Sequence, residues 1–217
     1  MSRHRRLPVI LALCAAAGLA LSACATPPSS APLPDPPASD AAPGDSLGSL
    51  RPAPPEGEVM AQGTVMDVAG DVELCLGAIR ESFPPQCDGI PLAGWSWNGV
   101  DGSETSGDVR WGAYALQGEY DGEAFTVTQP PIMLALYDPM PIPSEPQEPG
   151  VTDEDVLLAI QQELPDRLGG SILTSMAQEG RLVVDVVWDD GTWQKAADED
   201  YGQDVVVIRS ALRPVNP

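Results

Sequence analysis

Carboxylates are the most abundant side chains in this sequence that could do chemistry. The chain holds 32 acidic residues against 11 basic ones. Two carboxylates, one with a raised pKa, suffice for glycoside hydrolysis, so a carboxylate-dependent hydrolase is one hypothesis. The run Asp198, Glu199 and Asp200 falls in the last turn of a predicted helix, where the helix dipole disfavours negative charge. It is a weak calcium candidate, and a solvated acidic face is the more ordinary interpretation.

The first 23 residues are typical of a secretory signal. Three arginines precede an apolar run over residues 7–21, which is shorter than the roughly twenty residues that a membrane span requires. The run ends at Leu21-Ser22-Ala23-Cys24, which resembles the lipobox of bacterial lipoproteins. The resemblance implies cleavage before Cys24, a lipid on its sulfur, and a chain anchored to the extracytoplasmic face of the cell membrane.

Removal of residues 1–23 changes the chemistry of what remains. The only histidine, His4, leaves with the signal, so no Ser-His-Asp triad, Cys-His pair or histidine-ligated metal can be built in the mature chain. A Ser-Lys dyad would need Lys195, which lies inside a predicted helix. Eight basic residues then face 32 acidic ones, a formal charge of −24. This charge argues against nucleic acid as a partner, and we expect no cofactor and no catalytic residue.

Two cysteines remain when Cys24 carries the lipid. Cys75 and Cys87 form an even pair in an oxidising compartment, which predicts a disulfide. Metal ligation by the pair is the alternative, but the mature chain has no histidine or further cysteine to complete such a site. A bridge that closes this loop is worth about 3 kcal/mol in the chain-entropy model.

Composition divides the mature chain into four parts. Residues 24–58 hold the lipidated cysteine and a Pro- and Ala-rich stretch with almost no large apolar side chain, which predicts a disordered tether. Residues 59–137 form a first folded domain, residues 138–150 a Pro-rich linker, and residues 151–217 a second folded domain.

The first domain is predicted to be a small β-barrel. Short apolar runs cover residues 59–68, 72–79, 91–97, 109–120, 125–128 and 132–137, and Asp121-Gly122 suits a two-residue hairpin turn. Five or six short strands without a helical period favour an OB-like barrel, with a β-sandwich fragment as the alternative.

The second domain is predicted to be a two-layer α+β unit in the order helix, strand, strand, helix, strand. The first helix begins near Thr152, carries an apolar stripe and stops at Pro165. A hairpin over residues 172–177 and 182–188 turns at Glu179-Gly180, and Asp185 faces away from the apolar side. A second helix from Thr192 ends at Gly202, and residues 205–208 form the last strand. The two predicted stripes consist of Val156, Leu157, Ile160 and Leu164, and of Trp193, Ala196 and Ala197.

Aromatic and proline residues offer the best candidate binding surface. Trp95 and Trp97 lie two apart in a predicted strand, so they share a face, with Trp111 on the next long strand. They form either a platform for sugars or peptides or the core of a small domain. The loop Phe83-Pro84-Pro85-Gln86-Cys87 is stiffened by two prolines and the expected disulfide, which lowers the ordering cost of binding.

Three segments resemble a group of uncharacterised secreted lipoproteins from high-GC Gram-positive bacteria. They are Leu74-Cys75-Leu76-Gly77, then Glu81 through Cys87, then Gly94-Trp95-Ser96-Trp97. Phe83 stands where that group has tyrosine. Asp190-Gly191, Tyr201-Gly202 and residues 210–214 resemble the same group, so the resemblance covers most of the ectodomain, but it implies no activity. We therefore expect a lipid-anchored, non-catalytic binding or accessory module whose partner is an envelope protein or a cell-wall polymer. A glycan or small-ligand binder is the second hypothesis.

Overall fold

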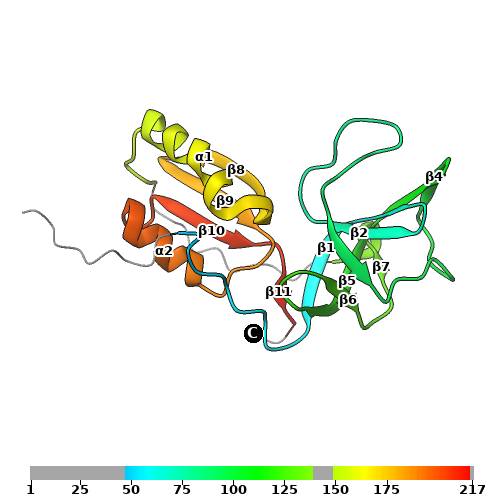
Figure 1. The fold of residues 1–217 in the computed structure, drawn as a ribbon. Helices are drawn as coiled ribbons and strands as arrows, with labels where there is room; N and C mark the ends of the chain where they lie inside the picture. The colour runs from blue at the N-terminus through cyan, green and yellow to red at the C-terminus, as the bar shows by residue number, and fades with distance from the viewer. Residues whose placement is uncertain (1–46, 139–148, 216–217) are drawn as a thin grey trace, which may run out of the picture. The chain divides into compact units, whose positions relative to one another are not determined.

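The computed structural model describes residues 47–138 and 149–215 (Figure 1). The predicted signal, Cys24, residues 25–46 of the predicted tether and most of the Pro-rich linker lie outside these residues. All described residues fall within one compact unit.

Five strands close into a β-barrel. Around the barrel the order is β1, β2, β3, β6, β5 and back to β1, and every pair is antiparallel except β3 with β6. Three short strands, β4, β7 and β11, add to its edges. The barrel strands are β1 (Val59–Val68), β2 (Asp71–Cys75), β3 (Ile90–Ala93), β5 (Val109–Tyr120) and β6 (Phe125–Val127). The short ones are β4 (Glu104–Ser106), β7 (Ile132–Met133) and β11 (Arg213–Pro214).

Alternate side chains of β5 point inward and fill the interior of the barrel. Tyr114 and Leu116 are fully buried in its core, together with Val65 from β1 and Leu74 from β2. Gly118 lets β6 approach closely, because a Cβ there would lie 2.1 Å from the carbonyl oxygen of Thr126.

The remaining elements form a three-stranded sheet packed against two helices. The sheet runs β8 (Ile172–Gln178), β9 (Arg181–Val186) and β10 (Val206–Ser210), with β9 central, antiparallel to β8 and parallel to β10. The helices are α1 (Glu154–Leu168) and α2 (Thr192–Tyr201), and the 3₁₀ turns are η1 (Leu134–Leu136) and η2 (Gly169–Ser171). Both helices bury apolar side chains in one cluster with those of β9 and β10. The fold is thus a β-barrel with an α+β part, but β4 was not predicted, and the predicted strand over residues 132–137 is β7 followed by η1.

Several predicted boundaries were wrong. Pro165 lies inside α1, which continues to Leu168 because a proline this close to the end removes only one helical hydrogen bond while Leu168 buries itself in the core. Val156 is half exposed, and Leu168 completes the buried stripe instead. The turn after β5 spans four residues, 121–124, rather than two, because the Asp121 carboxylate accepts hydrogen bonds from the backbone N–H groups of Glu123 and Ala124.

Residues 47–58, which were predicted to be part of the tether, are ordered. Leu47 is 2% exposed and packs with the buried side chains of α1 and α2. Gly48 follows at φ +85°, and a Cβ there would lie 2.1 Å from the carbonyl oxygen of Arg167. The prediction of disorder up to residue 58 is therefore wrong for residues 47–58, because one leucine and the backbone polar groups find partners on the α+β part. We call residues 47–53 the strap.

The two predicted folded domains are also not separate. Val187 and Leu212 are buried in the barrel core cluster, although both belong to the second predicted domain. β11 pairs with the start of β1, so the chain returns to the barrel after β10.

Candidate functional site

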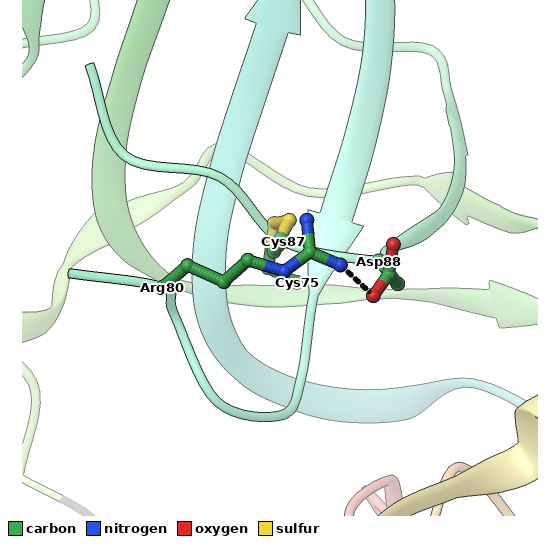
Figure 2. The surroundings of a disulfide bond; sticks show 4 residues. All are labelled: Cys75, Arg80, Cys87 and Asp88. Carbon is green, nitrogen blue, oxygen red and sulfur yellow. Dashed lines mark hydrogen bonds and ion pairs between the residues drawn. A yellow bond between two sulfur atoms is a disulfide. The ribbon is translucent and has the colours of Figure 1, made fainter. Parts of the chain in front are cut away.

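The loop between β2 and β3 is fixed at its base by a disulfide. Cys75 and Cys87 are bonded with their Cα atoms 6.0 Å apart, which confirms the predicted pairing. Figure 2 shows the ion pair between Arg80 and Asp88 beside this bridge. The Arg80 backbone N–H also donates to the Gln86 carbonyl at 2.8 Å. We call residues 76–89 the stapled loop.

Phe83 is presented at the tip of the stapled loop. Its relative exposure is 76%, the highest of any phenylalanine, tryptophan or tyrosine in the described residues. The Ser82 hydroxyl donates to the Pro84 carbonyl at 2.8 Å, which fixes the backbone on both sides of Phe83. The Phe83 ring meets Trp111 edge to face, with centroids 5.7 Å apart. The loop therefore holds an exposed aromatic ring in one position.

Trp111 lies on the outer face of the barrel. Gly112 and Tyr114, its neighbours on β5, alternate with it, and Tyr114 points into the core. The partners of Trp111 across the sheet are Met66 on β1 and Glu104 on β4. Of the three predicted tryptophans, Trp111 is the one that contacts the stapled loop through its ring.

The other two predicted tryptophans belong to the barrel core. Trp95 and Trp97 follow the end of β3 at Ala93, so the prediction that they lie in a strand was wrong. Gly94 leaves the strand at φ +71°, which ends the pairing. The two indoles lie 5.0 Å apart, and Tyr114 packs against them at centroid distances of 5.3 and 6.2 Å. Each is partly buried against the core.

Polar contacts hold this aromatic group in place. The Trp97 indole N–H donates to Asp67 at 2.8 Å, and the Arg110 guanidinium stacks over Trp97 at 4.3 Å from the ring centre. The Trp95 indole nitrogen is buried and has no hydrogen-bond partner among the described residues. The predicted platform is thus divided: Trp111 and Phe83 lie outside, and Trp95 and Trp97 support the core.

The acidic run at the end of α2 does not form a metal site. Asp198 accepts hydrogen bonds from Gln194, one turn earlier, and from the backbone N–H of Asp204, while Glu199 pairs with Lys195. Asp200 instead points to α1. Among the described residues, no group of three or more metal-ligating side chains occurs.

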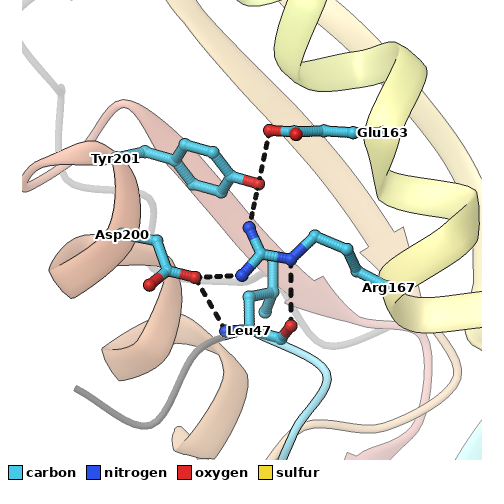
Figure 3. A network of polar contacts seen from close by, with 5 residues as sticks. All are labelled: Leu47, Glu163, Arg167, Asp200 and Tyr201. Atoms are coloured by element: carbon cyan, nitrogen blue, oxygen red, sulfur yellow. Dashed lines mark hydrogen bonds and ion pairs between the residues drawn. The ribbon is translucent and has the colours of Figure 1, made fainter. Parts of the chain in front are cut away.

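Asp200 takes part in a polar network with Arg167 (Figure 3). The Arg167 guanidinium forms an ion pair with Asp200, and donates to the Tyr201 hydroxyl and to the Leu47 carbonyl. The Leu47 backbone N–H donates to Asp200 at 2.8 Å. Negative charge at this helix end is thus offset by an arginine from α1 and by the backbone of the strap.

The same network raises the pKa of the Tyr201 hydroxyl. Burial of the ring is the main cause, and a hydrogen bond to the Glu163 carboxylate adds to it. Arg167 keeps its charge, because the hydrogen bonds to Asp200 and Tyr201 outweigh its burial and raise its pKa. The network therefore places a charged arginine side chain against the end of α2.

The structure contains a cleft that no sequence pattern indicated. Its volume is about 450 Å³, and it is lined by the strap, by the turn between β5 and β6, and by Trp188 and Trp193. The predicted hairpin strand over residues 182–188 ends earlier, because β9 ends at Val186 and Trp188 lines this cleft. The lining residues are spread over chain positions 51–193, so neither spacing nor a motif could reveal them.

Comparison with known proteins gave no relatives: no protein-family model, curated protein or solved structure matches the chain. In the described part of the chain, none of the helices has the length and apolar character needed to cross a membrane.

Proposed function

We propose that this chain is a lipid-anchored protein of the bacterial cell envelope and acts as a non-catalytic binding module through Phe83. The lipobox-like Leu21-Ser22-Ala23-Cys24 supports the anchor. The observation that carries the binding role is the 76% exposed Phe83 ring on a loop fixed by a disulfide and hydrogen bonds.

We also propose that the barrel is OB-like. In support, β1 pairs with β2 and β5, β2 pairs with β3, and the barrel closes through the parallel pair of β3 and β6, giving a five-stranded barrel in which the fourth and fifth strands exchange places. Barrels of this type bind ligands on the face formed by their second and third strands and on the loops after their first and fourth strands. The stapled loop joins the second and third strands.

An exposed aromatic ring on a fixed loop suits recognition of a protein. Aromatic side chains contribute much of the binding energy at interfaces when they enter an apolar pocket on the partner. A loop already held in shape has little conformational freedom left to lose on binding. Glu81 is exposed beside Phe83, whereas Asp88 is already paired with Arg80, so a partner pocket with a basic residue opposite Glu81 would be complementary.

The direction in which the pKa of four carboxyl groups is shifted supports a non-catalytic role. Hydrogen bonds lower the pKa of Glu58, Asp121 and Asp190. At Asp185, burial acts in the opposite direction, and hydrogen bonds from Arg209 and Thr174 outweigh it. A general acid in glycoside hydrolysis needs a raised pKa, and these four groups are shifted the other way.

Site-specific photo-crosslinking in intact cells of the native host tests the binding role. A photoreactive residue at Glu81, which is exposed and beside Phe83, should give a discrete adduct with an envelope protein. The Phe83→Ala background should reduce that adduct at least tenfold, since loss of a central aromatic anchor costs about 2 kcal/mol or more. The same probe at Leu136, which is 73% exposed and outside the stapled loop, serves as the control. Equal adducts with and without Phe83, or from both probe positions, would contradict the proposal.

The anchor is tested separately by Cys24→Ser. The unchanged chain should partition into the detergent phase of a phase-separating nonionic detergent, because two or more acyl chains give stable membrane attachment. The variant should move to the aqueous phase or remain unprocessed. Partition of the variant into the detergent phase in a processed form would refute lipidation at Cys24.

A further inference from the structure

The cleft beside the strap has two walls that hydrogen bonds hold in place. In the first wall, the Trp193 and Trp188 indole N–H groups donate to the carbonyls of Leu50 and Ala53, at 2.9 and 2.8 Å. The Ala53 backbone N–H donates to Asp190 at 3.0 Å. These three bonds fix the strap residues on either side of Arg51 and Pro52, which line the cleft.

The second wall is the turn between β5 and β6. The Asp121 carboxylate accepts from two backbone N–H groups of its own turn, and the Tyr120 hydroxyl donates to the Gly122 carbonyl at 2.8 Å. Both walls are therefore formed before any ligand arrives, which reduces the ordering cost of binding. A volume of about 450 Å³ lies within the range of roughly 300–1,000 Å³ that is common for small-ligand sites.

The cleft combines aromatic surface with two unpaired side chains of opposite charge. Tyr120 and Trp188 provide a partly exposed aromatic lining, to which Trp193, at 6% exposure, adds little surface. Arg51 and Glu123 are exposed, line the cleft, and have no side-chain hydrogen bond or ion pair among the residues that the structure describes. Glu123 lies close enough to Tyr120 that its charge, after burial and Asp121, helps to raise the pKa of the phenol.

We infer that this cleft binds a short, uncharged oligosaccharide. An anionic ligand would face the carboxylates of Asp121 and Glu123, and a cationic one would face Arg51. A wholly apolar ligand would leave these charges without water or partners. A neutral sugar places its C–H faces on the aromatic rings and offers hydroxyls that accept from Arg51 and donate to Glu123. Of these four ligand classes, a neutral sugar alone uses both the rings and the opposite charges.

The site is distinct from the surface that carries the proposed function. The cleft is lined by the strap, the β5–β6 turn and the two tryptophans, whereas Phe83 lies on the stapled loop. Loss of Phe83 should therefore leave sugar binding unchanged, and failure of one proposal does not imply failure of the other.

Titration of the full chain in detergent micelles with neutral trisaccharides tests the inference. The probes are the β-1,4-linked trimers of N-acetylglucosamine and of glucose, and the readouts are tryptophan fluorescence and isothermal titration calorimetry. We expect saturable binding of at least one trimer. Arg51→Ala and Glu123→Ala should each weaken it at least tenfold, since each removes a charged hydrogen-bond partner.

Two control variants make the result interpretable. Arg213→Ala removes an exposed arginine that does not line the cleft, and Phe83→Ala removes the exposed ring of the stapled loop; both should bind as the unchanged chain does. Circular dichroism of all four variants should match that of the unchanged chain, because the replaced side chains are exposed. Absence of saturable binding by either trimer, equal binding by the cleft variants, or tighter binding of a free amino acid or dipeptide would overturn the inference.

Discussion

The strap should contribute measurable stability through one side chain, Leu47. It is 2% exposed and packs with Leu164 and Leu168 of α1 and Ala197 of α2 in one buried cluster. Truncation of a fully buried leucine to alanine costs about 2–5 kcal/mol. Because Leu47 stands at the start of the strap and not in a helix or strand, its neighbours can relax into the space left by the truncation more easily than in the barrel core. We therefore expect Leu47→Ala to lower the free energy of unfolding by about 2–3 kcal/mol.

Leu50→Ala provides a matched control on the same strap. Leu50 is 43% exposed, and its contact with α2 is made by its backbone carbonyl, which the substitution keeps. We expect its effect to stay below about 0.5 kcal/mol.

Urea and thermal unfolding, followed by far-ultraviolet circular dichroism, measure both variants. For a chain of this size, 2–3 kcal/mol corresponds to a decrease in Tm of about 5–10 °C for Leu47→Ala. If Leu47→Ala and Leu50→Ala unfold at the same urea concentration, the strap adds no stability through Leu47 and the reasoning is refuted.

Three further perturbations test other features. Replacing Cys75 and Cys87 by serine should lower the free energy of unfolding by about 3 kcal/mol. A reducing agent should have the same effect on the unchanged chain and none on the variant. Equal stability of the oxidised chain, the reduced chain and the variant would contradict a structural role of the disulfide. Gly48→Ala should release the strap from α1. Gly48 has φ +85°, and the added Cβ would lie 2.1 Å from the carbonyl oxygen of Arg167. Limited proteolysis should cut the variant faster near the strap, and an unchanged rate would count against this close approach. Since the pKa of Asp185 is lowered in the folded chain, its stabilising effect is full above its unfolded pKa of about 3.9 and is lost as pH falls through the folded value. Asp185→Asn should therefore flatten the decline of stability with acid, and parallel unfolding profiles from pH 5 to pH 2 would exclude the effect.

Local sequence patterns predicted most of the elements. Alternation identified β5 and β9, and a cysteine pair identified the disulfide, because each signal lies within a short stretch of chain. The end of α1 was missed because the proline signal at position 165 was local, whereas the burial of Leu168 that extends the helix depends on the sheet.

The strap and the cleft could not be predicted for a related reason. A stretch of proline, alanine and serine has the composition of a disordered tether, and the composition of a segment does not show what surface it meets. Leu47 and Asp200 are 153 positions apart, and Leu50 and Trp193 are 143 apart. Only the folded chain brings them together. The prediction that Trp95 and Trp97 lie in a strand failed similarly, since side chains two apart share a face only where the strand continues.

The contacts of the strap determine which part of the molecule bears a mechanical force first. Any tension carried by the chain that precedes Leu47 reaches the ion pair of Arg167 and Asp200 and the apolar side chain of Leu47 before it reaches β1. The strap would detach first and lengthen the connection, while the barrel stays closed through the pairings of β1 with β5 and of β3 with β6. If the protein were held at a surface by this end of the chain, tension would therefore detach the strap in one short step. The barrel with its exposed Phe83 would remain folded under the same force.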